Sequence, residues 1–251
     1  MHKKGQVTIF IIISIFLVIA IVLFFIFKDN ITNKKIPQEI SPFYTNLISC
    51  LEQTSQEGIY YLAAHGGYYH APANSSIIYF LDEIPYYYLN NQTIVPELNI
   101  IERELEIYVS ENLENCLSLN KFRSQGFKID AEPYIISANM FQDSIFVRIL
   151  SSIIVSKEKN TLMLKNSEVN LKNNFNEIYE ASIEVVNSYS QKPGLICLTC
   201  LDQIIEKYDV DIQVLPVNDI SVSNNDIIWY LITDKQDKSE DKLKLIFVVE
   251  K

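Results

Sequence analysis

An uncharged apolar run, Val7–Phe27, is the sequence feature that most constrains how this chain can fold. Its only polar members are Thr8 and Ser14. At 1.5 Å per residue, a helix over this run would be about 31 Å long, close to the thickness of the hydrocarbon core of a bilayer. A buried helix of a soluble protein is rarely apolar on every face over such a length. The run therefore predicts a transmembrane helix.

The residues on either side of this run predict its orientation. Lys3 and Lys4 precede it, whereas Lys28 beyond it is offset by Asp29. Because basic residues concentrate on the cytoplasmic side, we expect a single span with the N-terminus in the cytoplasm. The rest of the chain is then expected on the extracytoplasmic side of the cell membrane.

A cleaved secretory signal is the alternative, but its apolar core usually has only about 7–15 residues and ends in small residues. Here the run ends in Phe-Phe-Ile-Phe-Lys, a poor cleavage site. A retained anchor is therefore the prediction. The polar residues 28–40 are expected to form a linker, followed by an extracytoplasmic domain over residues 41–251.

The segment Lys3-Lys4-Gly5-Gln6 resembles the class III signal of archaeal type IV pilins and related surface proteins. In that family a prepilin peptidase cuts after the glycine, and the apolar helix stays on the mature protein. The resemblance implies that residues 1–5 are a leader, that the cut falls between Gly5 and Gln6, and that residues 6–27 form an anchor or filament-core helix.

One position departs from the pilin pattern. Many pilins have a glutamate at the fifth mature position, where it helps subunits to dock, but Phe10 stands there in this chain. The resemblance thus implies a lone anchor or a minor subunit, whose N-terminal helix would mediate any homo- or hetero-assembly. The layout, with Cys50-Leu51-Glu52 on a helix and then a Gly-Gly-Tyr-Tyr segment, also resembles uncharacterised anchored proteins of small-genome archaea.

The charge balance excludes one large class of partner. The chain has 21 Lys and Arg against 31 Asp and Glu, a formal net charge of −10. Nucleic acids and anionic lipid surfaces are bound through basic faces. We therefore expect no nucleic-acid partner.

All four cysteines lie beyond the apolar run. An even number of cysteines in an extracytoplasmic domain favours disulfides, here with three pairings to choose from. The short spacing in Cys197-Leu-Thr-Cys200 makes Cys50–Cys116 with Cys197–Cys200 the preferred pairing. Free buried thiols are one alternative. A zinc site is the other, but structural zinc sites usually have two short-spaced ligand pairs, and this chain has one. We predict no metal and no cofactor.

Hydrophobic periodicity and turn residues predict an α+β fold in segregated blocks: a mostly antiparallel sheet with helices packed on one face. Ser41-Pro42 is expected to start the first helix and Gly66-Gly67 to end it. The sequence predicts helices over residues 41–64, 96–119, 174–189 and 195–208. It predicts strands over residues 68–69, 77–81, 86–89, 127–136, 144–156, 161–170, 210–217, 226–233 and 243–250.

A weak internal repeat accompanies this order of elements. At an offset of 83 residues, Ile129 aligns with Ile212, and Pro133 with Pro216. The pattern suggests a duplication of a helix-plus-sheet unit, over about residues 96–170 and 175–251.

Tyrosines are concentrated between residues 60 and 88. Tyrosine combines a flat apolar ring with a polar tip, which suits recognition of sugars or proteins, although it also packs well within sheets. In a regular strand Tyr86 and Tyr88 share one face and Tyr87 the other, so at least one is expected to be exposed. The candidate ligand-binding residues are Tyr68, Tyr69, Tyr86, Tyr87 and Tyr88.

The sequence contains none of the Gly-x-Ser-x-Gly, phosphate-loop or His-Glu-x-x-His motifs, which indicates a non-enzymatic protein. Our first hypothesis is therefore an anchored surface protein or pilin-like minor subunit. One alternative is a surface receptor that binds a glycan or partner through its tyrosine-rich face. Another is an extracytoplasmic thiol oxidoreductase using Cys197 and Cys200 at the start of a helix, where a thiol's pKa is lowered.

Overall fold

The computed structural model describes residues 14–19, 36–79, 82–131, 133–215, 227–235 and 242–251. Residues 14–19 are helical, and residues 15–19 are each at least half exposed. Within these described ranges, no helix is both long and apolar enough to cross a membrane. Most of the apolar run, the Gly5–Gln6 bond and residues 28–35 of the linker lie outside the described residues.

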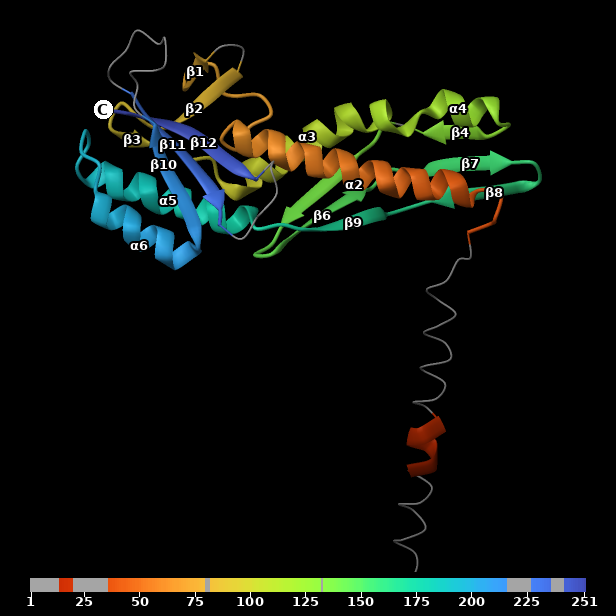
Figure 1. Cartoon of the computed structure of the whole chain (residues 1–251). Helices are drawn as coiled ribbons and strands as arrows, with labels where there is room; N and C mark the ends of the chain where they lie inside the picture. The colour runs from red at the N-terminus through yellow and green to blue at the C-terminus, as the bar shows by residue number, and fades with distance from the viewer. Residues whose placement is uncertain (1–13, 20–35, 80–81, 132, 216–226, 236–241) are drawn as a thin grey trace, which may run out of the picture.

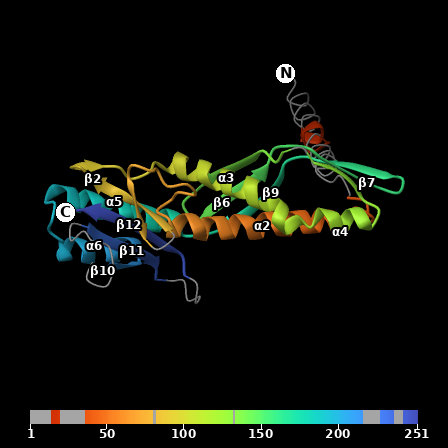
Figure 2. The same ribbon diagram turned by 90° about the horizontal axis from the view of Figure 1, so that it is seen from above.

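The body of the protein is elongated and α+β, as expected (Figure 1). Helix α2, Ser41–Ala64, runs along it beside the antiparallel helix α3, Leu98–Leu117. One end holds the short helix α4, Leu119–Ser124, and a β-meander, and the other end holds a larger sheet with two more helices. Seen from above in Figure 2, the same order of parts is kept along the long axis.

The two long helices pack through regular apolar faces. In α3 the buried residues recur at every fourth position: Ile101, Leu105, Val109, Leu113 and Leu117. This spacing places them along one side of a helix with 3.6 residues per turn. The predicted helix over residues 96–119 is therefore largely confirmed. Its end was misjudged because Ser118, at φ 47°, stops α3 and a new helix, α4, begins at once.

The first helix was predicted closely, with one difference in its cap. Ser41 was expected to cap it, but Ile40 holds the N-cap position, and Pro42 lies in the first turn. No side chain caps this end. Proline is well suited to a first helical turn because that turn has no internal partner for the backbone N–H that proline lacks.

The strands form three sheets instead of the single sheet that we predicted. Between residues 128 and 172 the chain makes a three-segment antiparallel meander, and each segment is interrupted about halfway. The outer half is the sheet β4-β7-β8 and the inner half the sheet β5-β6-β9. The strands of this meander are β4 Lys128–Ala131, β5 Ile136–Met140, β6 Ser144–Ile149, β7 Ile153–Lys157, β8 Asn160–Leu164 and β9 Ser167–Lys172.

Local chemistry explains the interruptions. Pro133 follows β4 and lacks the N–H that a ladder needs, and Asn166, between β8 and β9, has a left-handed φ of 53°. The predicted turn at Lys157–Asn160 is confirmed, because these two residues pair across a tight hairpin. The predicted strands 144–156 and 161–170 each merged two strands into one, whereas the predicted strand 127–136 covered β4 and missed all but the first residue of β5.

Helix α3 covers the open edge of the inner sheet. The backbone N–H groups of Ala138 and Met140 in β5 donate to the carboxylates of Glu106 and Glu102, at 2.9 and 2.7 Å. Two carboxylates four residues apart on a helix thus satisfy alternate N–H groups of an edge strand. This arrangement ties the helix pair to the meander.

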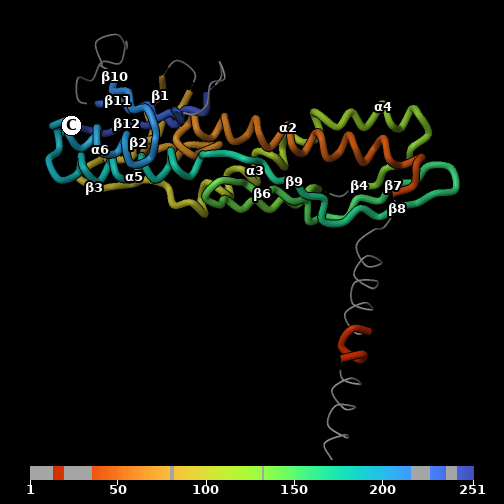
Figure 3. Tube along the Cα trace, turned by 60° about the horizontal axis from the view of Figure 1, so that its bottom comes forward, coloured from red at the N-terminus to blue at the C-terminus, as the bar shows by residue number. Residues whose placement is uncertain are grey.

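The larger sheet has the order β1-β2-β12-β11-β10, with β3 paired to β2. All its neighbouring strands are antiparallel except β12 and β2, which run parallel. Helix α5, Phe175–Gln191, and helix α6, Leu198–Tyr208, pack together beside it (Figure 3). Its strands are β1 Ser76–Tyr79, β2 Asp82–Leu89, β3 Gln92–Thr93, β10 Val210–Leu215, β11 Ile227–Asp234 and β12 Lys244–Glu250.

Both halves of the proposed repeat contain helices followed by an antiparallel meander. In one half the meander has three interrupted segments, β4 to β9, and in the other it has three strands, β10-β11-β12. Duplication itself stays a prediction. The predicted strand at Tyr68–Tyr69 was wrong: two left-handed glycines, Gly66 and Gly67, lead into an irregular segment there.

Candidate binding groove

The site is built where helices α2 and α3 approach each other closely, at Gly58. A Cβ added to Gly58 would lie 2.7 Å from Cδ1 of Tyr108 and 2.8 Å from Cδ1 of Leu105. Only glycine leaves room for these side chains against the helix backbone. Gly58 thus seats the Tyr108 ring on α2.

A disulfide fastens the same pair of helices. Cys50 in α2 and Cys116 in α3 are bonded, with their Cα atoms 5.6 Å apart. The second disulfide joins Cys197 to Cys200, so both bonds of the preferred pairing are present. Because disulfides persist in oxidising compartments, they indicate an extracytoplasmic location.

An open groove of about 900 Å³ lies along the exposed side of α2. Its lining combines aromatic or apolar residues with polar ones. The first kind are Tyr60, Tyr61, Ala64 and Tyr108. The polar residues of α2 are Ser49, Glu52, Gln53, Gln56 and Glu57, and two lysines come from before and at the start of β12, Lys242 and Lys244.

Tyr61 stands at the centre of an aromatic cluster at one end of this groove. Its ring stacks on His65 at 4.0 Å between centroids, and it meets Tyr108 at 5.5 Å and Tyr69 edge-on at 5.6 Å. Even with these neighbours Tyr61 remains 37% exposed. Three contacts therefore fix the orientation of a ring that is still open to solvent.

Hydrogen bonds hold the segment that brings Tyr69 to this cluster. The backbone N–H groups of Tyr69 and His70 donate to one carboxylate oxygen of Glu104 in α3, at 2.9 and 3.0 Å. Nδ1 of His65 lies 2.7 Å from the carbonyl oxygen of Tyr61, and its Nε2 lies 3.5 Å from Asp82. The His65 ring and the backbone of His70 thus help to position the aromatic rings.

The electrostatic setting keeps these tyrosines protonated. Burial, and then the negative charge of Asp82, raise the pKa of Tyr61. Burial and the charge of Glu57 do the same to the pKa of Tyr108. Both hydroxyls therefore remain neutral groups that can donate and accept hydrogen bonds at physiological pH.

The predicted ligand-binding tyrosines lie in different places. Tyr69 belongs to the cluster beside the groove, and Tyr68 is half-buried next to it. Tyr86 packs in a small apolar cluster with Trp229 and Val248 on the far side of the larger sheet. Their role in ligand binding stays a prediction.

Tyr87 and Tyr88 are both buried in the main core, and none of the three consecutive tyrosines is exposed. The expected alternation fails because the register slips: Tyr86 pairs with Val248 but Tyr88 with Val249. Tyr87 is thus an extra residue in β2, and both it and Tyr88 turn inward. The apolar and aromatic sequence of β2 contains no residue pattern from which this shift in register could be predicted.

The other cysteine pair lies at the opposite end of the body. Sγ of Cys197 caps helix α6 by accepting from the N–H of Cys200 at 3.3 Å. The flanking Leu195 and Leu198 are 65% and 69% exposed. The redox hypothesis for this pair stays a prediction.

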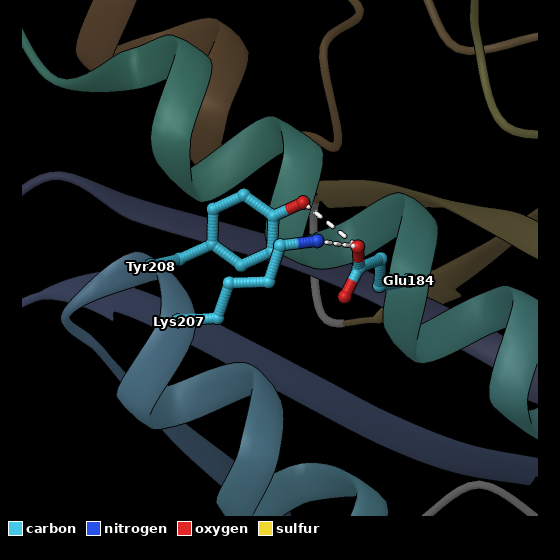
Figure 4. A network of polar contacts seen from close by, with 3 residues as sticks. All are labelled: Glu184, Lys207 and Tyr208. Carbon is cyan, nitrogen blue, oxygen red and sulfur yellow. Dashed lines mark hydrogen bonds and ion pairs between the residues drawn. The ribbon is translucent and has the colours of Figure 1, made fainter.

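Nearby, a surface network joins α5 to α6. The carboxylate of Glu184 accepts from Nζ of Lys207 and, at 2.9 Å, from the hydroxyl of Tyr208 (Figure 4). The hydrogen bond from Lys207 lowers the pKa of Glu184. The three side chains bind one another, so we interpret this network as a structural link between α5 and α6.

Among the side chains that the structure describes, no group of three or more His, Cys, Asp or Glu is placed to hold a metal ion. Comparison with protein families, with curated proteins and with solved structures finds no match for this chain. The groove is therefore interpreted from its own geometry. Sequence reasoning missed Tyr108, Lys242 and Lys244, because nothing in their local patterns joins them to residues 60 and 61.

Proposed function

We propose that this chain is a non-enzymatic, membrane-anchored surface protein whose extracytoplasmic body binds a ligand or partner. The observation that carries the proposal is the uncharged run Val7–Phe27 ahead of a body stapled by two disulfides. A membrane-spanning helix keeps a protein at the surface, and disulfides suit a domain exposed to an oxidising space. Cys50–Cys116 closes a loop of 66 residues, for which loop entropy predicts about 4 kcal/mol of stabilisation.

The finer form of the proposal concerns the leader. A prepilin-type peptidase would cut between Gly5 and Gln6 and leave Val7–Phe27 on the mature protein as an anchor or minor-subunit helix. Glycine adds no side chain at the cut, and Lys3 and Lys4 hold the bond at the cytoplasmic face. Phe10 in place of the docking glutamate favours a lone anchor or a minor subunit over a filament of many copies.

The test is the location and the N-terminal residue of the full-length protein expressed in an archaeal host. We expect it in the membrane pellet after alkaline washing, beginning at Gln6. Gly5→Val should leave the protein in the membrane but uncut, and Gly5→Ala is the matched control that should still be cut. A start at Met1 in the wild-type protein would leave a plain signal anchor. A soluble product that starts beyond Phe27 would overturn the proposal.

The groove supports the receptor alternative over a purely structural role. An open groove with an exposed, pre-oriented tyrosine is what a binding site requires, and a scaffold alone has no need of it. Sizing a mild-detergent extract distinguishes the assembly forms. A discrete small species fits an anchored receptor, and a ladder or fibres fit a pilin-like subunit.

A further inference from the structure

We propose that the groove along α2 binds a neutral oligosaccharide chain, with the Tyr61 ring as its stacking platform. This inference rests on the proposed function, because it gives a ligand class to the groove of an extracytoplasmic protein. It uses one element of that proposal only, the exposure of the body to the outside. The anchor and the leader are tested separately.

The dimensions of the groove suit a chain more than a single small molecule. Its lining residues on α2 extend from Ser49 to Ala64, which is about 22 Å of helix at 1.5 Å per residue. Its volume of about 900 Å³ is near the upper end for ligand pockets. An open trough of this length accepts several linked units and lets both ends of a chain leave.

The aromatic lining supplies the apolar contact that a sugar ring needs. Sugar rings present C–H faces, which pack on aromatic rings, while their rims present hydroxyls. Tyr61 is 37% exposed, and its ring is stacked on His65. Tyr108 lies beside it, seated by Gly58. Little side-chain entropy would be lost on binding because these rings are already ordered.

The polar lining supplies both kinds of hydrogen-bonding group. Each sugar hydroxyl can donate and accept at once. The carboxylates of Glu52 and Glu57 accept, the ammonium groups of Lys242 and Lys244 donate, and the amide of Gln56 does both. The amide of Gln53 already donates to Glu57 at 2.9 Å, which orders these two side chains.

Charge argues against the other ligand classes. The lining includes two carboxylates, Glu52 and Glu57, and two ammonium groups, Lys242 and Lys244, so neither sign of charge prevails in it. In the described part of the chain, no ion pair joins these carboxylates to these lysines. A polyanion would meet Glu52 and Glu57 on a chain of net charge −10. A neutral, hydroxyl-rich chain meets no such repulsion.

Saturation-transfer NMR and calorimetry on the full chain in detergent provide the test. The probes are a mannose tetramer, an N-acetylglucosamine tetramer and a heparin tetrasaccharide. We expect at least one neutral tetramer to bind and heparin not to. Tyr61→Ala should weaken binding about tenfold, whereas Tyr61→Phe, which keeps the stacking face, should retain most of it.

Phe141→Ala is the matched control, because Phe141 is an aromatic residue 54% exposed on the meander, outside the groove. It should leave binding unchanged. Circular dichroism checks that each variant is folded, and Glu57→Gln provides a second, milder change in the groove that should weaken binding with the fold intact.

Three results would overturn the inference: no binding of either neutral tetramer at millimolar concentration, tighter binding of heparin, or binding that Tyr61→Ala leaves unchanged. A protein found in the membrane and cut at Gln6 but without sugar binding would refute the ligand class alone. A protein that binds sugar but is released as a soluble domain would refute the anchor alone.

Discussion

Helix α2 and the larger sheet both contain tyrosines, but Tyr61 on α2 and Tyr87 in the sheet lie in opposite environments. Tyr87 in the larger sheet is fully buried, stacks on Phe247 at 4.3 Å and donates to the carbonyl oxygen of Gly66 at 3.0 Å. Tyr61 on α2 also has ring neighbours but is 37% exposed. Tyrosine density in a sequence therefore does not identify a binding surface. What matters is whether the backbone turns the ring into the core.

The largest effect we expect is unfolding at alkaline pH, caused by ionisation of the buried tyrosines. Burial raises the pKa of Tyr134, Tyr179 and Tyr230 to about 12, from an ordinary value of 10.0. Since the folded state then holds these protons more tightly than the unfolded chain, their contribution is intact below pH 10 and is lost as the pH rises toward 12. We expect cooperative loss of the near-ultraviolet circular dichroism signal in that window.

The absorbance of tyrosinate sharpens this test. Exposed tyrosines should ionise first and reversibly. The buried tyrosines should ionise only when the protein unfolds. A single smooth titration of all fifteen tyrosines, without loss of structure, would contradict the division into two sets.

Tyr87→Ala should be the most damaging single tyrosine change. It removes a large ring from the packed core and leaves the carbonyl oxygen of Gly66 without this donor. Substitutions of this type cost about 3–5 kcal/mol. Tyr61→Ala should change the free energy of unfolding by less than about 1 kcal/mol because its ring is only partly buried. Urea denaturation of the two variants measures the difference. Equal losses in the free energy of unfolding would contradict the distinction between a buried Tyr87 and a partly exposed Tyr61.

Gly58→Ala tests the close packing of α2 against α3 beside the groove. The new methyl group gains about 1 kcal/mol of helix propensity but overpacks Tyr108 and Leu105, which costs about 1–3 kcal/mol. We expect a net loss of about 1 kcal/mol and a displaced Tyr108 ring. Thr45→Ala, on an exposed position of the same helix, is the control and should be nearly neutral. A Gly58→Ala variant more stable than the wild type would show that the helices are not closely packed there.

The smallest expected effect comes from Glu184, the carboxylate that binds Lys207 and the hydroxyl of Tyr208 at the surface. Because the folded-state pKa of Glu184 is lowered, its contribution is present above its ordinary value and is lost as the pH falls through the lowered one. Glu184→Gln should therefore flatten the acid limb of the stability profile slightly and leave neutral-pH stability almost unchanged, since the network is exposed. A large drop in melting temperature at neutral pH would contradict this assignment.

Much of the local structure could be predicted from the sequence. The spacing of apolar residues in α2 and α3 defines their buried faces, and the turn between β7 and β8 follows from a polar, charged break between two apolar runs. Short cysteine spacing pointed to the correct disulfides. Each of these signals is contained within a few residues or depends on simple counting.

The rest depends on contacts between distant segments. The parallel pairing of β12 with β2 joins residues about 160 positions apart, and its slip at Val248 decides where Tyr87 and Tyr88 point. The groove needs Tyr61, Tyr108 and Lys242 to meet, and they come from three separate elements. Glycine is a poor helix former, and the reason for Gly58 inside α2 becomes clear only from the packing of α2 against α3.

Peroxidase-catalysed iodination of intact cells that express the full chain tests whether the body lies outside the cell with Tyr61 accessible, because the enzyme cannot cross the membrane and labels only exposed tyrosines. We expect the protein in the membrane fraction to be labelled at Tyr61, while Tyr87 and Tyr88 are labelled only after denaturation. A neutral tetramer that binds should protect Tyr61. Labelling only after lysis would place the body inside the cell, and labelling of Tyr87 as fast as Tyr61 would contradict the division between core and groove.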